Sequence, residues 1–334
     1  MRIEEIRDWL RRHGARPCHA ERVLRAWTCA RPLESGRVAA ADFLPAALRA
    51  ALPELAQRLD DLARVRSEHL ADDGASRLLF ELGDGLSVEG VLLPRQGLCV
   101  STQVGCAVGC RFCMTGREGL QRQLGSAEIV AQVAVARARR EVRKVVFMGM
   151  GEPAHNLDNV LDAIELLGTA GGFAHKNLVF STVGDRRAFE RLAQGPVKPA
   201  LALSLHTTRD ELRAQLLPKA PRIDPAELVA LADAYGRATG YPVQYQWTLL
   251  EGVNDGDAEL AALTELLRGR HAVMNFIPYN ETDGGGFRRT PRARAEAMTL
   301  HLYRNGILAK LRQSAAEEVA GACGQLRARE LAAA

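Results

Sequence analysis

The feature that most constrains the fold is an alternation of apolar runs and helical stretches that begins after Pro94. Short apolar runs bounded by turn residues predict buried strands, and the stretches between them predict amphipathic helices. Because parallel strands need long crossover connections, this alternation predicts an α/β fold with a parallel sheet, and about six βα units fit a partial barrel. The predicted strands are Leu98–Val104, Lys144–Gly149, Asn177–Ser181, Ala200–Leu205, Val243–Leu249 and Ala272–Pro278.

Two smaller segments precede the alternation. Apolar residues at helical spacing predict short helices at Ile3–Arg12, Ala20–Thr28 and Pro45–Leu52. Farther along, the runs Leu78–Leu82 and Leu86–Leu93 flank Gly83-Asp84-Gly85, which indicates a β-hairpin. We therefore expect four segments, namely a small helical N-terminal domain (1–60), a hairpin linker (61–91), the barrel (92–318) and a C-terminal segment (319–334).

Composition and charge set few further limits. The chain is 47% hydrophobic and 25% charged, which is typical of a folded globular protein. Residues 1–14 lack the apolar core of a signal peptide and no later run is long enough to span a membrane, so we expect a cytoplasmic protein without a membrane partner. The net charge of +4 permits a nucleic-acid partner without indicating one. The densest basic run, Arg137–Lys144, is explained equally well by a solvated helix face.

Three of the seven cysteines, Cys106, Cys110 and Cys113, lie within eight residues. This grouping suits a metal site in a reducing compartment better than a disulfide framework. Three thiolates on one loop can hold three irons of a [4Fe-4S] cluster and leave the fourth iron open. A structural zinc site would need a fourth cysteine or histidine at comparable spacing, and the sequence has none. The spacing therefore favours a cluster whose open iron can chelate the amine and carboxylate of S-adenosylmethionine (SAM).

Polar residues stand where the predicted strands end. Parallel β/α barrels carry their chemistry at the carboxyl ends of the strands. Taken alone, each such residue could cap a helix or close a strand end, but their occurrence on successive strands favours one shared site. These residues are Cys106, Gly151-Glu152-Pro153, Ser181, Ser204-Leu205-His206 and Asn280.

The sequence resembles the radical SAM superfamily and, within it, the RlmN/Cfr family of RNA methyltransferases. The resemblance extends from His19-Ala-Glu-Arg-Val-Leu-Arg-Ala-Trp27 through Cys99-Val-Ser-Thr-Gln-Val-Gly-Cys106 to Gly321-Ala-Cys-Gly-Gln-Leu326. The three-cysteine motif is common to the superfamily, whereas Cys99 and the Ala-Cys-Gly-Gln-Leu sequence are more specific. The resemblance implies a partial (β/α)6 barrel of radical SAM type, a [4Fe-4S] cluster on Cys106, Cys110 and Cys113, and two SAM molecules per turnover.

The resemblance also implies the residues that contact SAM. Gly151 and Glu152 would meet its amino group, since carboxylates and backbone carbonyls accept hydrogen bonds from ammonium. The ribose, carboxylate and adenine would be contacted by Ser181, Ser204, Leu205, His206 and Asn280.

Three further residues are implied to act on the substrate. An adenine carbon is too weak a nucleophile to attack SAM directly, so a radical route is required. By resemblance, Cys323 accepts a methyl group as a thiolate, and a 5′-deoxyadenosyl radical then converts it to a methylene radical that adds to the base. Cys99 would release the product through a transient Cys99–Cys323 disulfide, and Glu89 would accept the proton. Without this context a lone cysteine is more often a buried small hydrophobe, and a strand glutamate more often faces water.

The expected target is C2 of an adenosine in 23S ribosomal RNA and, for some family members, in transfer RNA. The Gly-Glu-Pro sequence favours C2, and C8 methylation of Cfr type is the alternative. The base must be unstacked to be reached, and the N-terminal helices are expected to hold the RNA. A reductant such as flavodoxin or ferredoxin and a monomeric state are also expected.

Two segments depart from the family pattern and leave the target open. Residues 313–321 replace a Gly-Asp-Ile-like stretch, and Leu216–Pro221 replaces a Pro-Ile-Asn-like segment. A divergent radical SAM enzyme, such as one that attaches sulfur to transfer RNA, would show a second cysteine group, which this chain lacks. A non-catalytic iron-sulfur RNA-binding protein would need neither the SAM residues nor Cys323.

Overall fold

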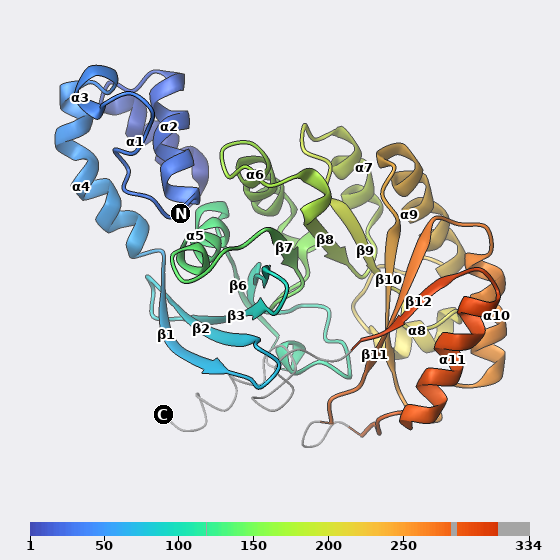
Figure 1. Ribbon diagram of the computed structural model, residues 1–334. Coiled ribbons are helices and arrows are strands. Elements are labelled where there is room, and N and C mark those ends of the chain that lie inside the picture. The colour runs from blue at the N-terminus through green and yellow to red at the C-terminus, as the bar shows by residue number, and fades with distance from the viewer. Residues whose placement is uncertain (118, 282–285, 313–334) are drawn as a thin grey trace.

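The computed structural model describes residues 1–117, 119–281 and 286–312. Most strands in these ranges form one ten-stranded sheet in the order β1-β2-β3-β4-β7-β8-β9-β10-β11-β12 (Figure 1). Its strands are β1 (Ala63–Leu70), β2 (Ser76–Leu82), β3 (Ser87–Leu93), β4 (Gly97–Cys99), β7 (Lys144–Phe147), β8 (Leu178–Thr182), β9 (Ala200–Ser204), β10 (Val243–Leu249), β11 (Ala272–Pro278) and β12 (Leu308–Leu311).

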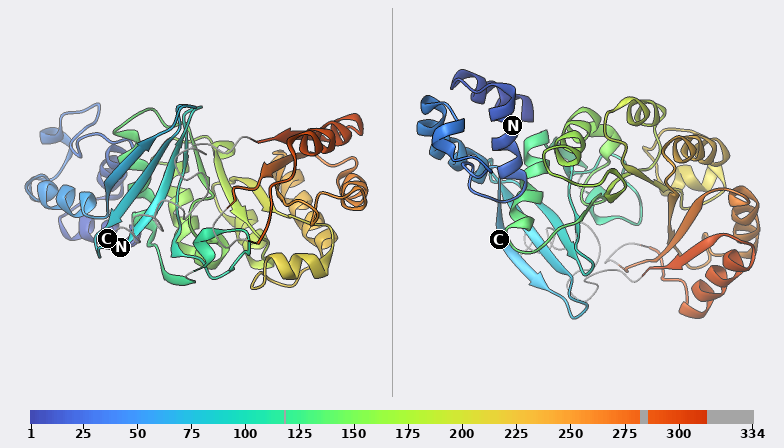
Figure 2. Two further views of the ribbon diagram at one scale, coloured as in Figure 1. Left: turned by 90° about the horizontal axis from the view of Figure 1, so that it is seen from below. Right: turned by 45° about the horizontal axis from the view of Figure 1, so that its top comes forward.

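The sheet has an antiparallel region and a parallel region. Strands β1 to β4 pair antiparallel, and from β4 to β12 every neighbouring pair is parallel. Within the described residues β1 and β12 are the two edges, so the sheet is curved but open (Figure 2). The expected α/β class with a partial barrel is thus confirmed.

Helices cover the outer face of the parallel region (Figure 2). The described residues include no helix long and apolar enough to cross a membrane. The crossover helices are α5 (Ser126–Arg137), α6 (Leu157–Gly168), α7 (Arg186–Gln194), α8 (Asp210–Leu216), α9 (Pro225–Thr239), α10 (Asp257–Leu267) and α11 (Arg292–Arg304).

Four N-terminal helices pack beside α5, at the end of the sheet that carries the hairpin (Figure 1). One hydrophobic core runs without a break from Ile3 on the first helix to Ile307 before β12. The backbone N–H of Ile3 also donates to Ser126 Oγ at the start of α5 (2.9 Å). These helices are α1 (Ile3–Arg12), α2 (Pro17–Thr28), α3 (Ala40–Phe43) and α4 (Ala46–Asp60).

The prediction of one strand over Leu98–Val104 is wrong. The chain leaves the sheet after Cys99, and β5 (Gln103–Gly105) pairs with β6 (Leu120–Gln123) in a separate two-stranded sheet. Ser101 is drawn out of the ladder by side-chain partners: its N–H and C=O bond the amide of Gln132, and its hydroxyl donates to Glu89 O (2.6 Å). Residues 98–104 thus form one largely apolar stretch of sequence, but their backbone pairs with two different sheets.

The N-terminal segment also differs from expectation, since α3 is not predicted and α2 begins at Pro17 instead of Ala20. The sequence predicts that helix α4 ends at Leu52, before Pro53, but the helix continues through this proline to Asp60. Its buried residues Leu48, Leu52, Leu55 and Leu59 recur at helical spacing, so packing on both sides of the proline outweighs the lost hydrogen bond. The hairpin of β2 and β3 is confirmed, with Leu79 opposite Glu89.

Candidate active site at the carboxyl ends of the parallel strands

The loop after β5 carries Cys106, Cys110 and Cys113. Gly105 precedes it with a φ of +77°, and a Cβ at this position would lie 2.0 Å from the carbonyl oxygen of Gly119. This close approach lets Cys106 N–H donate to that same oxygen (3.0 Å), while Cys113 N–H donates to Cys110 O (3.0 Å). The local geometry therefore needs glycine before the first cysteine and closes the loop on itself.

The three thiols lie near enough to influence one another. Burial, followed by the nearby charges of Glu152 and Cys113, raises the pKa of Cys106 to about 12. Burial and the neighbouring Cys113 and Cys106 raise the pKa of Cys110 well above its ordinary value. Such thiols stay protonated unless a cation deprotonates them, which is what a bound metal does to its thiol ligands. The donor set thus fits an iron-sulfur cluster.

No three His, Cys, Asp or Glu side chains in the described ranges are arranged to hold a single metal ion. A cubane cluster differs from such a site, because each cysteine binds a separate iron. The described cysteines also form no disulfide with one another.

Glu152 follows β7 and links it to the next strand. Its carboxylate accepts hydrogen bonds from the backbone N–H groups of Ala154 (3.1 Å) and Val183 (3.0 Å), the latter just after β8. Burial raises the pKa of Glu152, although Thr182 and these N–H groups act in the opposite direction. Its two oxygens still have lone pairs for a ligand ammonium. Gly151 beside it has a φ of +101° and lies against Gln103.

His206 follows β9 in the left-handed region, with a φ of +63°. Its Nδ1 accepts the backbone N–H of Thr248 (3.0 Å), so the ring proton is on Nε2, and Asn254 donates to its carbonyl oxygen (2.8 Å). Burial and then the charge of Arg213 lower the pKa of His206 to about 3. His206 is thus a neutral hydrogen-bond donor at physiological pH.

The other expected SAM residues differ in what they can offer. Ser181 in β8 is buried, Ser204 at the end of β9 is half-buried, and Asn280 follows β11. Asn280 Oδ1 is buried without a hydrogen-bond partner among the described residues, which suits an acceptor that meets a ligand donor. The Leu205 side chain is fully buried in the core, and its N–H donates to Gln246 O (3.0 Å). Leu205 could therefore reach a ligand only through its carbonyl group.

Arg213 on α8 is a site residue that the sequence did not reveal. It is 3% exposed, and its guanidinium donates to Ser204 O (3.1 Å) and to Val183 O. Arg213 joins the ends of β8 and β9, and its charge interacts with Cys110 and Glu152. An arginine within Glu-Leu-Arg-Ala-Gln is typical of a solvated helix face, so no local signal marks its burial.

Cys99 and Glu89 lie on the inner face of the sheet, opposite the helices. Residue pairing puts Val91 beside Cys99, Cys99 beside Val146, and Val146 beside Val179, and these residues form a second, smaller apolar cluster. Glu89 is two residues from Val91 on β3, so it shares this face. Its carboxylate lies 3.3 Å from the guanidinium of Arg77. Cys323 lies outside the described residues.

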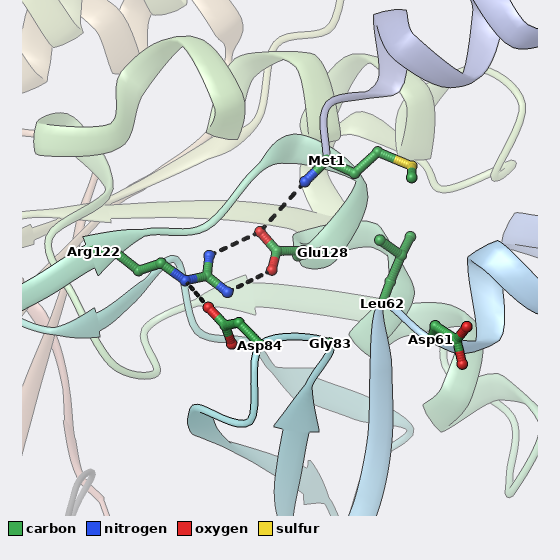
Figure 3. Close-up of a pocket in the computed structure, with 7 residues that line it drawn as sticks. All are labelled: Met1, Asp61, Leu62, Gly83, Asp84, Arg122 and Glu128. Carbon is green, nitrogen blue, oxygen red and sulfur yellow. Dashed lines mark hydrogen bonds and ion pairs between the residues drawn. The ribbon is translucent and has the colours of Figure 1, made fainter.

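Two hollows lie apart from these residues. The first, of about 320 Å³, contains a network in which Arg122 binds Asp84 (2.6 Å) and Glu128 (2.7 Å), with the amino group of Met1 3.8 Å from Glu128 (Figure 3). The second is a groove of about 1010 Å³ that is lined by α2, by residues 31–43 and by the segment that joins α6 to β8. Since that segment precedes β8, the groove lies at the amino ends of the strands, away from the cysteine loop.

An open β/α sheet with a three-cysteine loop and polar residues at its strand ends defines a radical SAM protein. The model of the radical SAM superfamily matches residues 100–264. A "Probable RNA methyltransferase" from Aromatoleum aromaticum is 69% identical over 99% of this chain and 94% of its own length. One from Methylibium petroleiphilum is likewise 69% identical, with the same coverage. A solved structure of a radical SAM methyltransferase from Sphaerobacter thermophilus has a TM-score of 0.83 and 36% identity, covering 98% of both chains. The chain belongs to the radical SAM superfamily and to the RlmN/Cfr-like family within it, so it is a SAM-dependent enzyme.

Proposed function

We propose that this protein is a radical SAM RNA methyltransferase that methylates C2 of an adenosine in 23S ribosomal RNA, with transfer RNA as a second substrate class. The observation that carries this proposal is that one sheet holds two sets of reactive side chains. One is the cysteine loop with polar strand ends, and the other is Cys99 and Glu89 on the inner face of the same sheet. The names of the relatives support RNA as the substrate.

The cofactors would be held by the residues described above. Cys106, Cys110 and Cys113 would bind a [4Fe-4S] cluster, and Gly151, Glu152, Ser181, Ser204, Leu205, His206 and Asn280 would bind SAM. When bound, this pair would supply the one-electron chemistry that turns a methyl group carried by Cys323 into a carbon radical. Two SAM molecules are consumed per turnover, one as methyl donor and one as radical source.

The chain's own residues carry out the transfer. The Cys323 thiolate accepts the methyl group, and after loss of one hydrogen atom its S-methylene carbon bonds to the adenine carbon. Glu89 takes the proton displaced from that carbon, and one electron returns to the reducing system. The Cys99 thiolate then attacks Cys323 sulfur, the sulfur–carbon bond breaks, and its electron pair and a proton complete the new methyl group. Cellular thiols reduce the resulting Cys99–Cys323 disulfide.

The remaining features of the proposal concern organisation and partners. The chain divides into the helical N-terminal domain (1–60), the hairpin (61–91), the barrel (92–318) and the C-terminal segment (319–334). It acts in the cytoplasm as a monomer, with a flavodoxin or ferredoxin as reductant. The N-terminal helices hold the RNA. The first of them, α1, starts on the carboxyl side of the sheet, because Ile3 N–H donates to Ser126 Oγ at the start of α5.

The experiment that tests the proposal is mass spectrometry of RNA nucleosides from cells with and without the gene. We expect 2-methyladenosine to disappear and to be restored by the wild type and by Cys18→Ala, but not by Cys323→Ala. Loss of 8-methyladenosine would instead indicate the Cfr type of reaction. An unchanged nucleoside profile would refute RNA methylation. Purified protein that binds RNA but consumes no SAM under reducing conditions would favour a non-catalytic iron-sulfur protein.

A further inference from the structure

A buried ion pair lies on the inner face of the hairpin. The guanidinium of Arg77 on β2 is 3.3 Å from the carboxylate of Glu89 on β3. Both residues are 1% exposed. Charged side chains are rarely buried this completely, because the loss of hydration must be offset by their mutual attraction. Because a buried ion pair contributes little net stability, the position of this pair suggests a role in the reaction.

Sheet register places this pair next to Cys99. Arg77 is directly opposite Val91, and Val91 is directly opposite Cys99. Directly opposite residues share a face, so Arg77, Val91 and Cys99 form one row across three strands. The even-numbered apolar residues of β2 and β3, such as Phe80 and Val88, belong to the main core on the other face.

Glu89 belongs to the same face because it is two residues from Val91. Its backbone is also tied to the chain just after Cys99, since Ser101 Oγ donates to Glu89 O (2.6 Å). The clustered residues around this row include Ala71, Ala75 and Val146, which are small and apolar. The carboxylate of Glu89 therefore lies on a face that carries small apolar side chains, with the guanidinium of Arg77 beside it.

This setting bears on how Glu89 is held for the proton-transfer step. A guanidinium offers only hydrogen-bond donors, so Arg77 can hold the Glu89 oxygens without competing with them for a proton. Arginine also presents its N–H groups in a rigid fork, which fixes the direction of the carboxylate.

We propose that Arg77 is a positioning residue that holds the Glu89 carboxylate in place, on the face of the sheet that carries Cys99, for the proton-transfer step. The inference rests on the proposed function, because it assumes that Glu89 accepts the proton displaced from the adenine carbon. In that step the carbon–hydrogen bond breaks, the proton moves to Glu89, and Arg77 neither gains nor loses a proton. Arg77 acts before the sulfur–carbon bond to Cys323 is broken.

The test compares Arg77→Gln, Arg77→Lys and Glu89→Gln in the full-length, anaerobically reconstituted protein. Arg64→Gln serves as a matched control, since Arg64 lies on the adjacent strand β1 but is exposed and paired with Asp61. Each protein is incubated with reductant, SAM and total RNA from cells that lack the gene. SAM consumption, methyladenosine and RNA-linked protein on a denaturing gel are measured, together with thermal melting.

We expect Arg77→Gln and Glu89→Gln to consume SAM in the first turnover as the wild type does. Both should accumulate RNA-linked protein that nuclease removes, with at least a tenfold loss of methyladenosine. Arg77→Lys should recover most of the product because it retains the cation, and Arg64→Gln should match the wild type.

Three outcomes would overturn the inference: product release by Arg77→Gln at the wild-type rate, failure of Arg77→Lys to recover it, or loss of both cooperative melting and SAM consumption in Arg77→Gln. The last would show that the cation supports the fold instead. Failure of the proposed function would look different, because the wild type itself would form no methyladenosine.

Discussion

At the scale of single residues, the site depends on side chains whose ionisation is set by burial. His206 illustrates this, since its ring accepts one backbone N–H, is neutral, and lies in edge contact with Phe112 of the cysteine loop (centroids 4.8 Å apart). The ring thus links the strand ends to the loop that carries the cysteines. A charged imidazole in this position would bring a second cation next to Arg213.

The first prediction concerns the pH dependence that His206 confers. Its folded pKa of about 3 lies below its ordinary value of 6.5, so the unfolded state binds the extra proton first. His206 therefore destabilises the fold progressively as the pH falls below 6.5, by about 2 kcal/mol at about pH 5. In His206→Asn, which tolerates a positive φ and can accept the Thr248 N–H, the loss of stability between about pH 7 and pH 5 should be smaller. Urea unfolding at several pH values measures this, and identical pH slopes for both proteins would contradict it.

Gly105 gives a second prediction with a matched control. Gly105→Ala would place a Cβ 2.0 Å from Gly119 O, whereas Gly74 has nearly the same φ (+78°) with nothing within 4 Å. Both substitutions carry the strain of a left-handed alanine, but only Gly105→Ala displaces the loop of Cys106. We expect the iron content after anaerobic reconstitution to fall several-fold in Gly105→Ala and to stay near the wild type in Gly74→Ala. Equal iron content in the two variants would show that the loop tolerates the displacement.

At the scale of elements, polar contacts between segments decide where strands end and how they are held. Ser101 ends β4, Glu152 joins the ends of β7 and β8, and Arg213 joins those of β8 and β9. Around the first hollow, Arg122 of β6 connects the hairpin turn at Asp84 to the start of α5 at Glu128 (Figure 3). These contacts fix elements whose apolar packing alone would allow small shifts.

The Asp84–Arg122 contact yields the third prediction. Although burial acts in the opposite direction, the hydrogen bond from Arg122 leaves the pKa of Asp84 below its ordinary 3.8. The contact therefore stabilises the fold above about pH 4 and is lost as the pH falls through the lower folded value. Because both side chains are partly exposed, Asp84→Asn should lower the free energy of unfolding by no more than about 1 kcal/mol at pH 7. The difference should shrink as the pH falls below about 4, and a difference that stays constant in urea unfolding over that range would contradict this account.

At the scale of the whole molecule, the cysteine loop is separate from the main core. Among the described residues, the core that joins the N-terminal helices to the sheet contains no cysteine, while Cys106 and Cys110 pack in a small cluster with Leu216 and Leu217. Two backbone hydrogen bonds join the cysteine loop to residues 216–219. Arg111 N–H donates to Leu216 O (3.0 Å), and Lys219 N–H donates to Val108 O (3.2 Å). The loop that would hold the cluster therefore packs outside the main core.

The fourth prediction follows from this separation. Iron removal by a chelator should leave the far-UV circular dichroism and the main melting transition nearly unchanged. Hydrogen-exchange protection should fall in residues 106–117 and 216–220, and not in β8 to β10, which serve as the internal control. Global unfolding on iron loss would show that the cluster supports the main core.

Local sequence alone accounts for the features that depend on neighbouring residues along the chain. The spacing of Cys106, Cys110 and Cys113, the hairpin around Gly83-Asp84-Gly85 and the strands Val243–Leu249 and Ala272–Pro278 follow from local patterns. Strand alternation also predicted that polar residues such as Glu152 and His206 would stand at the strand ends, because parallel strands end at the same edge.

Tertiary packing settles the features that depend on partners far apart in the sequence. The register of β2, β3 and β4 brings Arg77, Glu89 and Cys99 to one face, and Arg213 is buried because its guanidinium finds carbonyl oxygens on two other strands. Strand β1, with its charged and alternately exposed residues, and the short β12 pair only because a neighbouring strand offers an edge. Which strands pair and which side chains are buried depends on the free energy of the whole assembled sheet. The local sequence restricts only the conformations that each segment can adopt.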